Sequence, residues 1–235
     1  MRWGTVLLTP GLPQVWDLNL FRVERAPRYL AAWRLAGATD RALGAAGLRH
    51  RSIVVDDDEL GVRLRPGLEA RGWRTEELLV MALRGTPDRP PAAVEIREVT
   101  EPELRPARDR YLRTAPYGRD PGTRRQLLAE GARAERAPGL RRIAAIAGGE
   151  PVAWCRLYAA EGTAEVDDVV TLEEHRNRGL ARAVVLSAAQ TAHEGGADLV
   201  FLRADAADWP RKLYERLGFA TIGQHYVFRL VGGAR

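Results

Sequence analysis

The sequence predicts an α/β (α+β) protein made of a smaller unit followed by a larger, related unit. Apolar stretches with the period of two that is typical of strands are interspersed with stretches of helical periodicity. A glycine pair, Gly148 and Gly149, separates two apolar runs, and this pattern indicates an antiparallel hairpin. A segment near the end of the first half also recurs near the end of the chain. With 235 residues, 46% of them hydrophobic, the chain can bury the core of such a fold.

A proline-rich segment divides the chain. Residues 84–92 show no hydrophobic periodicity and contain three prolines, which is typical of an exposed connection between packed units. We therefore expect a first domain at residues 1–84, a linker at residues 85–92 and a second domain at residues 93–235.

The second domain is expected to follow the order βααββ and then βαβαβ. The strands predicted by alternation cover residues 94–99, 141–147, 152–158, 165–171, 199–203 and 225–231. The predicted helices cover residues 103–113, 123–136, 179–193 and 210–217.

An internal repeat relates the two halves. Residues 53–73 align without a gap on residues 199–219, at a constant offset of 146 residues (199 minus 53). Each segment contains an apolar strand, an acidic loop, a helix and then a glycine–aromatic pair. A strand at 16–23 and a helical stretch at 27–46 extend the parallel upstream. Chance similarity between two strand–helix units is the alternative, but the gapless alignment favours a shortened first copy.

Composition excludes several classes of protein. The single cysteine, Cys155, cannot form an internal disulfide, and no histidine or cysteine spacing suits a metal site, so no metal is expected. No apolar run is long enough for a membrane span or a signal peptide, so we expect a cytoplasmic protein without a membrane partner. The net charge of +5 would suit nucleic acid or an anionic cofactor. Because the arginines are spread along the chain rather than clustered, we expect no nucleic-acid partner.

A strand, a polar turn and a helix follow one another over residues 166–181. The first amides of a helix lack intrahelical partners and its dipole favours an anion, so such a junction can bind phosphate. Gly179 and Ala181 leave room for close approach, while Arg176 and Arg178 add positive charge. An ordinary helix start with exposed arginines is the alternative.

This stretch resembles the pyrophosphate-binding signature of the GCN5-related N-acetyltransferase (GNAT) family, Gln/Arg-x-x-Gly-x-Gly/Ala. A second block of that family corresponds to residues 213–219, and the resemblance covers residues 94–230. It implies a mixed, mostly antiparallel, twisted sheet with helices on both faces, and an acetyl-CoA-dependent N-acetyltransferase. The resemblance also implies that the pyrophosphate is held by the signature residues Arg176, Asn177, Arg178, Gly179, Leu180 and Ala181.

Further roles are implied by the same resemblance. In that family the strand before the signature separates from its neighbour, which would leave the main chain of Val169, Val170 and Thr171 to bind the pantetheine arm. The amide of Val169 would then donate a hydrogen bond to the thioester oxygen. Tyr214 stands where a tyrosine protonates the departing thiolate, although a tyrosine simply packed on the sheet is the alternative. The first copy has Leu68 at the corresponding position, so it is not expected to bind acetyl-CoA productively.

The general base and the acceptor are less defined by the sequence. Glu165 and Asp167 are the nearest carboxylates on the strand, on the face that Val169 shares by simple alternation, and Asp168 on the other face is an alternative. The acceptor is expected to be a primary amine: a small molecule, a peptide N-terminus and a protein lysine all fit. A non-catalytic acetyl-CoA sensor or scaffold is the alternative function. Homodimer formation is left open.

Overall fold

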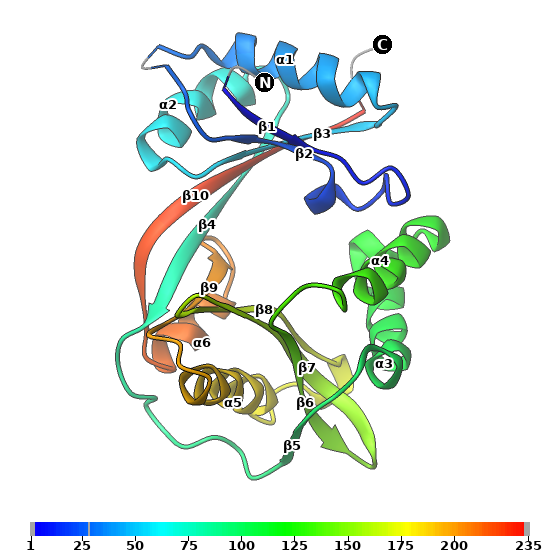
Figure 1. The fold of residues 1–235 in the computed structure, drawn as a ribbon, viewed down its shortest axis with the longest axis vertical. Coiled ribbons are helices and arrows are strands. Elements are labelled where there is room, and N and C mark those ends of the chain that lie inside the picture. The colour runs from blue at the N-terminus through cyan, green and yellow to red at the C-terminus, as the bar shows by residue number, and fades with distance from the viewer. Residues whose placement is uncertain (1–2, 28, 233–235) are drawn as a thin grey trace. The chain divides into compact units, whose positions relative to one another are not determined.

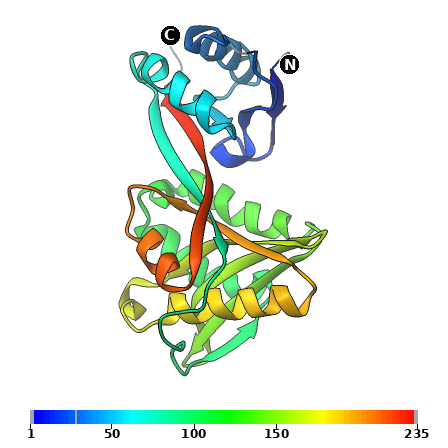
Figure 2. The ribbon, with the colours of Figure 1, turned by 90° about the vertical axis from the view of Figure 1, so that its left-hand side faces the viewer.

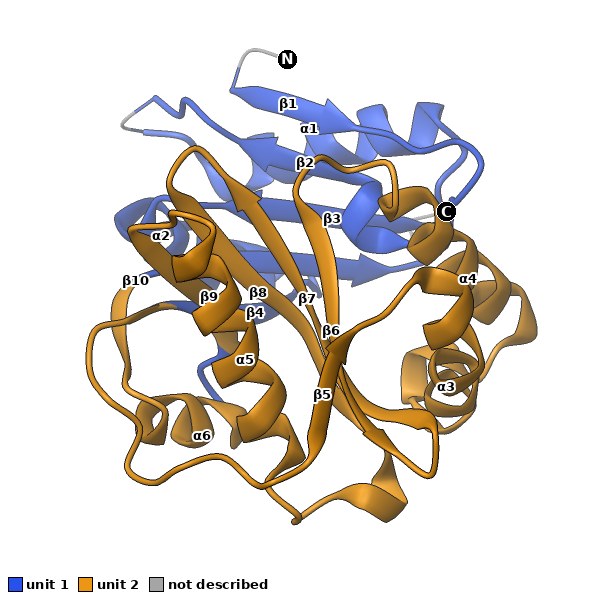
Figure 3. Cartoon of the chain, turned by 60° about the horizontal axis from the view of Figure 1, so that its bottom comes forward, with its two compact units in different colours: residues 1–80, 205–207, 223–235 blue, residues 81–204, 208–222 orange. Residues whose placement is uncertain are grey.

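The structure is a computed structural model that describes residues 3–27 and 29–232. The remaining positions of the predicted domains, and residue 28 of the helix expected at 27–46, lie outside the described residues. The chain forms two compact units, shown in blue and orange in Figure 3. Unit 1 comprises residues 1–80, 205–207 and 223–235, and unit 2 comprises residues 81–204 and 208–222.

Strands and helices are interspersed along the chain, as Figure 1 shows. The strands are β1 (Gly4–Leu7), β2 (Leu20–Val23), β3 (His50–Val55), β4 (Arg74–Leu83), β5 (Glu95–Glu98), β6 (Leu140–Ala147), β7 (Glu150–Ala160), β8 (Thr163–Thr171), β9 (Leu199–Asp205) and β10 (Phe219–Val231). The α-helices are α1 (Ala32–Ala45), α2 (Asp58–Glu69), α3 (Glu101–Thr114), α4 (Pro121–Ala134), α5 (Leu180–Glu194) and α6 (Pro210–Arg216). The short 3-10 helices are η1 (Trp16–Leu18), η2 (Pro116–Gly118) and η3 (Glu173–His175).

Unit 1 is built on a mixed sheet. β1 pairs antiparallel with β2, β2 pairs parallel with β3, and β3 pairs antiparallel with β10. The helices α1 and α2 pack against each other and against β3. The apolar side chains between them form one core, which includes Phe21, Leu35, Ile53, Leu64 and Phe228.

Unit 2 contains the larger set of strands. Successive pairs from β5 to β8 are antiparallel, and β8 pairs parallel with β9. Cys155 and Arg156 are neighbours on β7 and so point to opposite faces. The Cys155 thiol donates to the carbonyl oxygen of Val184 in α5, whereas Arg156 donates to Glu130 of α4. Helices therefore cover both faces of a mostly antiparallel sheet, which confirms the predicted fold class (Figure 2).

The elements predicted for the second half are all present, with ends that differ by a few residues. Helix α3 begins earlier than expected because Thr100 and Glu103 form a capping box ahead of the first turn. The strand expected at 16–23 begins only at Leu20. The Asn19 side chain donates to the carbonyl oxygens of Leu12 and Val15, at 2.8 and 2.9 Å, and this holds the preceding backbone in a turn. The sequence analysis did not predict β1 and β4.

The structure supports the internal repeat. The first segment forms β3 and α2 and leads into β4, while the second forms β9 and α6 and leads into β10. The glycine before each aromatic residue has a left-handed backbone, with φ of 81° at Gly72 and 93° at Gly218. The parallel pair β2–β3 in unit 1 also has a counterpart, β8–β9, in unit 2.

Residues 85–92, predicted as a linker, are held within unit 2. The Gly85 amide donates to the carbonyl oxygen of Gly218 at 3.0 Å, and the Asp88 amide donates to that of Arg216 at 2.9 Å. None of the described helices is long and apolar enough to cross a membrane.

Candidate functional site

Strands β8 and β9 separate partway along their length. Their parallel register covers only Thr163–Val166 of β8, although β8 continues to Thr171 and β9 continues to Asp205. The main chain of β8 after Val166 therefore has no register partner in β9. This is the separation of strands that the family resemblance implied.

A β-bulge lies in the separated part of β8. Arg156 of β7 pairs with Asp167, and Trp154 pairs with Val170, so Asp168 and Val169 share the space opposite one β7 residue. Asp168 has φ of 50°, which is rare outside glycine. Val169 has no register partner in either β7 or β9. The extra residue also interrupts the simple alternation by which Glu165, Asp167 and Val169 were expected to share a face.

The loop between β8 and α5 contains two residues with a left-handed backbone. Asn177 and Gly179 have φ of 60° and 77°, while Arg178 between them has negative φ. Left-handed residues on both sides of a residue with negative φ can turn neighbouring amides toward one point. Gly179 is the N-cap of α5 and supplies no side chain to cap the first amides of the helix. The loop therefore presents amides and a helix N-terminus together, as the sequence predicted.

Two cations accompany this loop. Arg176 and Arg178 are exposed, and their guanidinium groups donate only to the carbonyl oxygens of Thr171 and Glu174, at 3.4 and 3.1 Å. Within the described part of the chain, neither guanidinium pairs with a carboxylate. Both charges are thus available to an anion at the start of α5.

A third arginine, which the sequence analysis missed, fixes the segment beside this loop. Arg182 of α5 is 2% exposed, and its Nη2 lies 2.7 Å from Asp88 Oδ1. Its Nη1 donates to the carbonyl oxygen of Arg89 at 3.1 Å. A Cβ added to Gly179 would lie 3.4 Å from the Cβ of Ala92, so the segment passes close to the start of α5. An arginine within the apolar run of α5 was the signal that could have revealed this contact.

Tyr214 of α6 is buried, with 7% of its surface exposed. Its ring packs edge-on against Phe219 at 6.2 Å, and its hydroxyl has no hydrogen-bond partner among the described residues. Burial raises the pKa of Tyr214, and the negative charge of Asp167 adds to this effect. The phenol therefore stays protonated at neutral pH.

The carboxylates on β8 have different surroundings. Glu165 lies in the part of β8 that pairs with β9, and it accepts a hydrogen bond from Arg203 Nε at 2.7 Å. Burial raises the pKa of Glu165, while Arg203 opposes this rise. Asp167 lies one residue beyond the last β8–β9 pair and close enough to Tyr214 to affect its pKa. Asp168 Oδ2 approaches Arg156 Nε at 3.4 Å.

The Cys155 thiol is held in an unreactive form, and the described residues form no cluster of metal ligands. Burial raises the pKa of the Cys155 thiol, so the thiol is held in its unreactive protonated form. Among the described residues no group of three or more histidine, cysteine, aspartate or glutamate side chains could hold a metal ion.

A known family profile matches the part of the chain that contains β8, the loop before α5 and Tyr214. Residues 98–219, more than half of the chain, match the sequence profile described as the acetyltransferase (GNAT) family. No curated protein sequence matches the chain.

Solved structures with the same fold cover nearly all of the chain. A conserved protein of unknown function from Staphylococcus epidermidis superposes with a TM-score of 0.77 at 15% identity, over 99% of this chain and 92% of that one. A GCN5-related N-acetyltransferase from Kribbella flavida gives 0.64 at 23% identity, over 94% and 84%. A tandem GNAT protein from the clavulanic acid biosynthesis pathway gives 0.60 at 14% identity, over 92% and 76%.

Proposed function

This chain belongs to the acetyltransferase (GNAT) family, and on that premise we propose that unit 2 transfers an acetyl group from acetyl-CoA to a primary amine. The family's fold supports acyl transfer in general. The observation that carries the finer proposal is the separation of β8 from β9 directly before an anion-binding loop. The two features lie at successive points of one segment, as an elongated thioester with a pyrophosphate requires.

The residues that would hold acetyl-CoA fit its chemistry. The loop from Arg176 to Ala181 would bind the pyrophosphate, because its two exposed guanidinium groups lack carboxylate partners among the described residues. The main chain of Val169, Val170 and Thr171 would bind the pantetheine arm along the open edge of β8. When bound, acetyl-CoA supplies an acetyl thioester that an amine can attack.

Three groups of the chain would assist a direct transfer within a ternary complex. The Val169 amide donates to the thioester oxygen and stabilises the charge that develops there. Asp167 accepts a proton from the ammonium group, directly or through water, and this frees the nitrogen lone pair to form the nitrogen–carbon bond. Tyr214 protonates the thiolate that leaves as the carbon–sulfur bond breaks, and the second proton lost by the nitrogen returns to Tyr214 through water. Glu165 remains the second candidate base, but its ion pair with Arg203 makes it less free to accept a proton.

The described residues of unit 1 contain no equivalent of this site. Helix α1 begins at Ala32, and between β2 and α1 no described residue has positive φ. Leu68 occupies the position that Tyr214 has in the second copy. We propose that unit 1 does not bind acetyl-CoA and that the protein acts in the cytoplasm without a metal.

Calorimetric titration with acetyl-CoA tests this function before the acceptor is known. We expect one site per chain, lost in a Gly179→Glu variant that places a carboxylate in the anion-binding loop. Gly148→Glu is the matched control, because Gly148 also has positive φ and its added Cβ would meet no atom within 4 Å. Two sites per chain would contradict the proposal for unit 1, and no binding would overturn the proposal for unit 2. Binding without thiol release across a panel of amines would favour a sensor.

A further inference from the structure

A charged and aromatic patch lies beside the proposed transfer site in unit 2. We call it the acceptor patch, and it consists of Arg108, Tyr111, Tyr117, Arg156 and Asp168. These residues come from α3, η2, β7 and the bulge of β8. Asp168 directly precedes the valine whose amide is proposed to bind the thioester oxygen. A molecule seated on the patch would therefore lie next to the reacting carbonyl.

The charged side chains of the acceptor patch differ in their ion pairs and in how far they are exposed to solvent. Arg156 Nη1 and Nη2 donate to the two carboxylate oxygens of Glu130, at 2.8 and 2.9 Å, and Arg108 Nη1 donates to Glu101 at 3.1 Å. The side chains of Arg108 and Arg156 are 8% and 7% exposed, while that of Asp168 is 28% exposed. A ligand can thus reach the carboxylate more readily than either guanidinium. The reachable charge is negative and suits a cation.

Asp168 also has hydrogen-bonding capacity to spare. Its Oδ2 is buried and lies 3.4 Å from Arg156 Nε and 4.0 Å from Arg108 Nε. Its other oxygen, Oδ1, is not buried and accepts no hydrogen bond from the described residues, so Oδ1 is the oxygen that a ligand can reach. Burial raises the pKa of Asp168, and the two arginines oppose this rise. An ammonium group carries three donors and a positive charge, so it matches this carboxylate.

Two tyrosines form the aromatic side of the patch. The Tyr117 hydroxyl donates to the Tyr111 hydroxyl at 2.9 Å, and Tyr111 packs edge-on against Trp154 with ring centroids 6.1 Å apart. Tyr117 is 55% exposed. Burial of its hydroxyl and the bond to Tyr111 raise the pKa of Tyr117, and the charge of Asp168 adds to the rise. Tyr111 lies one turn after Arg108 on α3, and Arg108 Nε is 4.0 Å from Asp168 Oδ2, so the tyrosine pair and the carboxylate belong to the same region. An exposed ring beside a carboxylate can hold a cation and an apolar body together.

We propose that the acceptor patch binds a primary ammonium group attached to an apolar or aromatic body without a neighbouring carboxylate, as in an arylalkylamine. The inference rests on the proposed function, because it names the acceptor class of the same site. An α-amino acid is disfavoured since its carboxylate would approach Asp168 and Glu130, while the arginines that could neutralise it are covered.

Amine binding to the full-length protein, saturated with CoA, tests the inference by calorimetry. The probes are 2-phenylethylamine and phenylalanine, which differ by the carboxylate. We expect the amine to bind about tenfold or more tightly than the amino acid. Equal binding, tighter binding of phenylalanine, or no binding of 2-phenylethylamine would overturn the inference. A separate acetyl-CoA titration reports on the proposed function, so its failure is distinguishable from failure of amine recognition.

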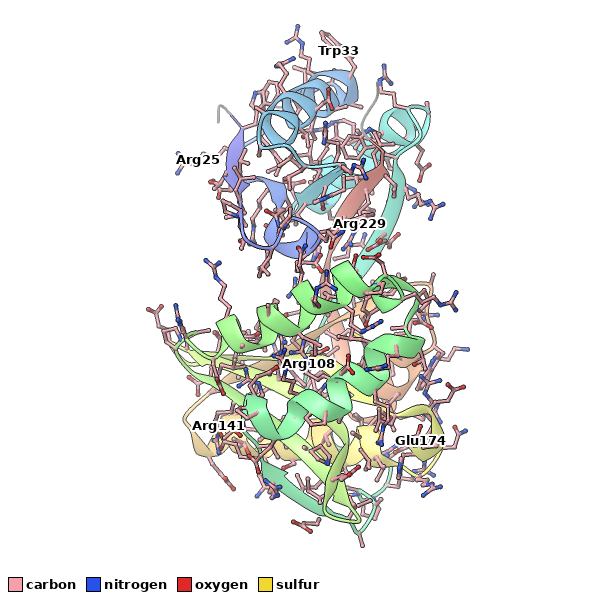
Figure 4. All side chains as sticks on the ribbon, turned by 90° about the vertical axis from the view of Figure 1, so that its right-hand side faces the viewer. Arg25, Trp33, Arg108, Arg141, Glu174 and Arg229 are labelled. Carbon is pink, nitrogen blue, oxygen red and sulfur yellow. The ribbon has the colours of Figure 1, made fainter. Side chains whose placement is uncertain are left out.

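Two variants test whether the acceptor patch is responsible for the preference for the amine over the amino acid. We expect Asp168→Asn to weaken 2-phenylethylamine binding about tenfold and Tyr117→Leu about threefold, with acetyl-CoA affinity unchanged. In turnover, both should raise the KM for the amine and leave the KM for acetyl-CoA unaffected. Trp33→Leu is the control, because Trp33 is an exposed aromatic residue of unit 1 (Figure 4). If Asp168→Asn does not fold, Tyr117→Leu is the deciding variant, because Tyr117 is exposed and its replacement should not disturb folding. Wild-type amine affinity in Tyr117→Leu would then overturn the inference.

Discussion

At the scale of the residue, burial keeps Tyr214, the proposed general acid, in its protonated form. A phenol in water has a pKa of about 10. Burial raises the pKa of Tyr214 above that value, and the hydroxyl has no hydrogen-bond partner among the described residues. The side chain therefore keeps its proton over the whole neutral range and can donate it to a leaving thiolate.

Replacing Tyr214 by phenylalanine should lower kcat about 100-fold and leave acetyl-CoA affinity unchanged, because only proton donation is lost. Steady-state kinetics and calorimetry on the same preparation check both parts. Because the working form is the protonated one and its pKa is raised, wild-type kcat should not fall through loss of this proton below about pH 10. Tyr226→Phe, a buried tyrosine of unit 1, is the control. Wild-type kcat in the Tyr214 variant would exclude the general-acid role.

Ion pairs in unit 2 contribute differently to the stability of the fold, depending on how deeply they are buried. Arg108 and Arg141, both labelled in Figure 4, have side chains that are 8% and 45% exposed. Exposed pairs contribute little, whereas removing one partner of a buried pair leaves an uncompensated charge. Burial alone would raise the pKa of Glu130, but hydrogen bonds and charge from Arg156 and Arg108 outweigh it and hold that pKa below its usual value.

Glu130→Gln should therefore lower the free energy of unfolding by about 3 kcal/mol at pH 7. A lowered folded-state pKa stabilises above the unfolded value of about 4.3, and this stability is lost as the pH falls through the folded-state pKa. The difference from wild type should accordingly shrink toward pH 3. Chemical denaturation between pH 3 and 7 measures it.

Glu98→Gln is the control for this series, because its pair with Arg141 at 2.9 Å is exposed. Its effect should stay below about 1 kcal/mol at every pH. If Glu130→Gln and Glu98→Gln gave the same small effect, the buried network would not contribute as described.

At the scale of the element, helix α5 joins the proposed cofactor site to the neighbouring segment. Its first turn follows the anion-binding loop, and Arg182 in that turn holds Asp88 and the carbonyl oxygen of Arg89. Arg182 Nε is buried without a hydrogen-bond partner in the described part of the chain. The ion pair with Asp88 is thus the main compensation for a buried charge.

Asp88→Ala should lower the free energy of unfolding by about 2 kcal/mol, since Arg182 would lose its carboxylate partner while staying buried. It should also speed tryptic cleavage after Arg84, which precedes Gly85, because the segment would be released from α5. Urea denaturation and timed proteolysis measure the two effects. Asp198→Ala, in a loop of the same unit, should change neither. Unchanged cleavage in Asp88→Ala would show that the backbone hydrogen bonds alone fix the segment.

At the scale of the whole molecule, the last strand completes the first compact unit. Residues 223–235 belong to unit 1, where β10 pairs with β3. Phe228 and Tyr226 of β10 are fully and almost fully buried in the unit 1 core. Unit 1 therefore cannot complete its core until β10 has been made.

Phe228→Ala should cost about 4 kcal/mol, because a fully buried aromatic ring is removed from a packed core. Hydrogen exchange should rise most in β3 and α2, although they lie far from Phe228 in sequence. Ile222→Ala on the same strand is 49% exposed and should cost about 0.5 kcal/mol or less. Protection that stays unchanged in β3 after Phe228→Ala would contradict this role of the C-terminal strand.

The sequence predicted most of unit 2, and the structure confirms its order of helices and strands. Periodicity works there because most of these helices and strands are long enough to repeat their hydrophobic pattern. It worked less well at residues 16–23, where the hydrogen bonds of Asn19 to Leu12 and Val15 replace a strand by a turn. A polar side chain that bonds to backbone several residues away leaves no periodic trace.

Local sequence was enough to predict the strand β8, the loop with Gly179 that is proposed to bind an anion, the helix that follows and the repeated glycine–aromatic pair. These depend on residues close together in the chain, so a short pattern contains them. Only the tertiary structure decided that Arg203 engages Glu165, that a bulge turns Asp168 toward two arginines, and that β10 pairs with β3. Those contacts join residues distant in sequence, and their energies depend on burial and register that no local pattern specifies.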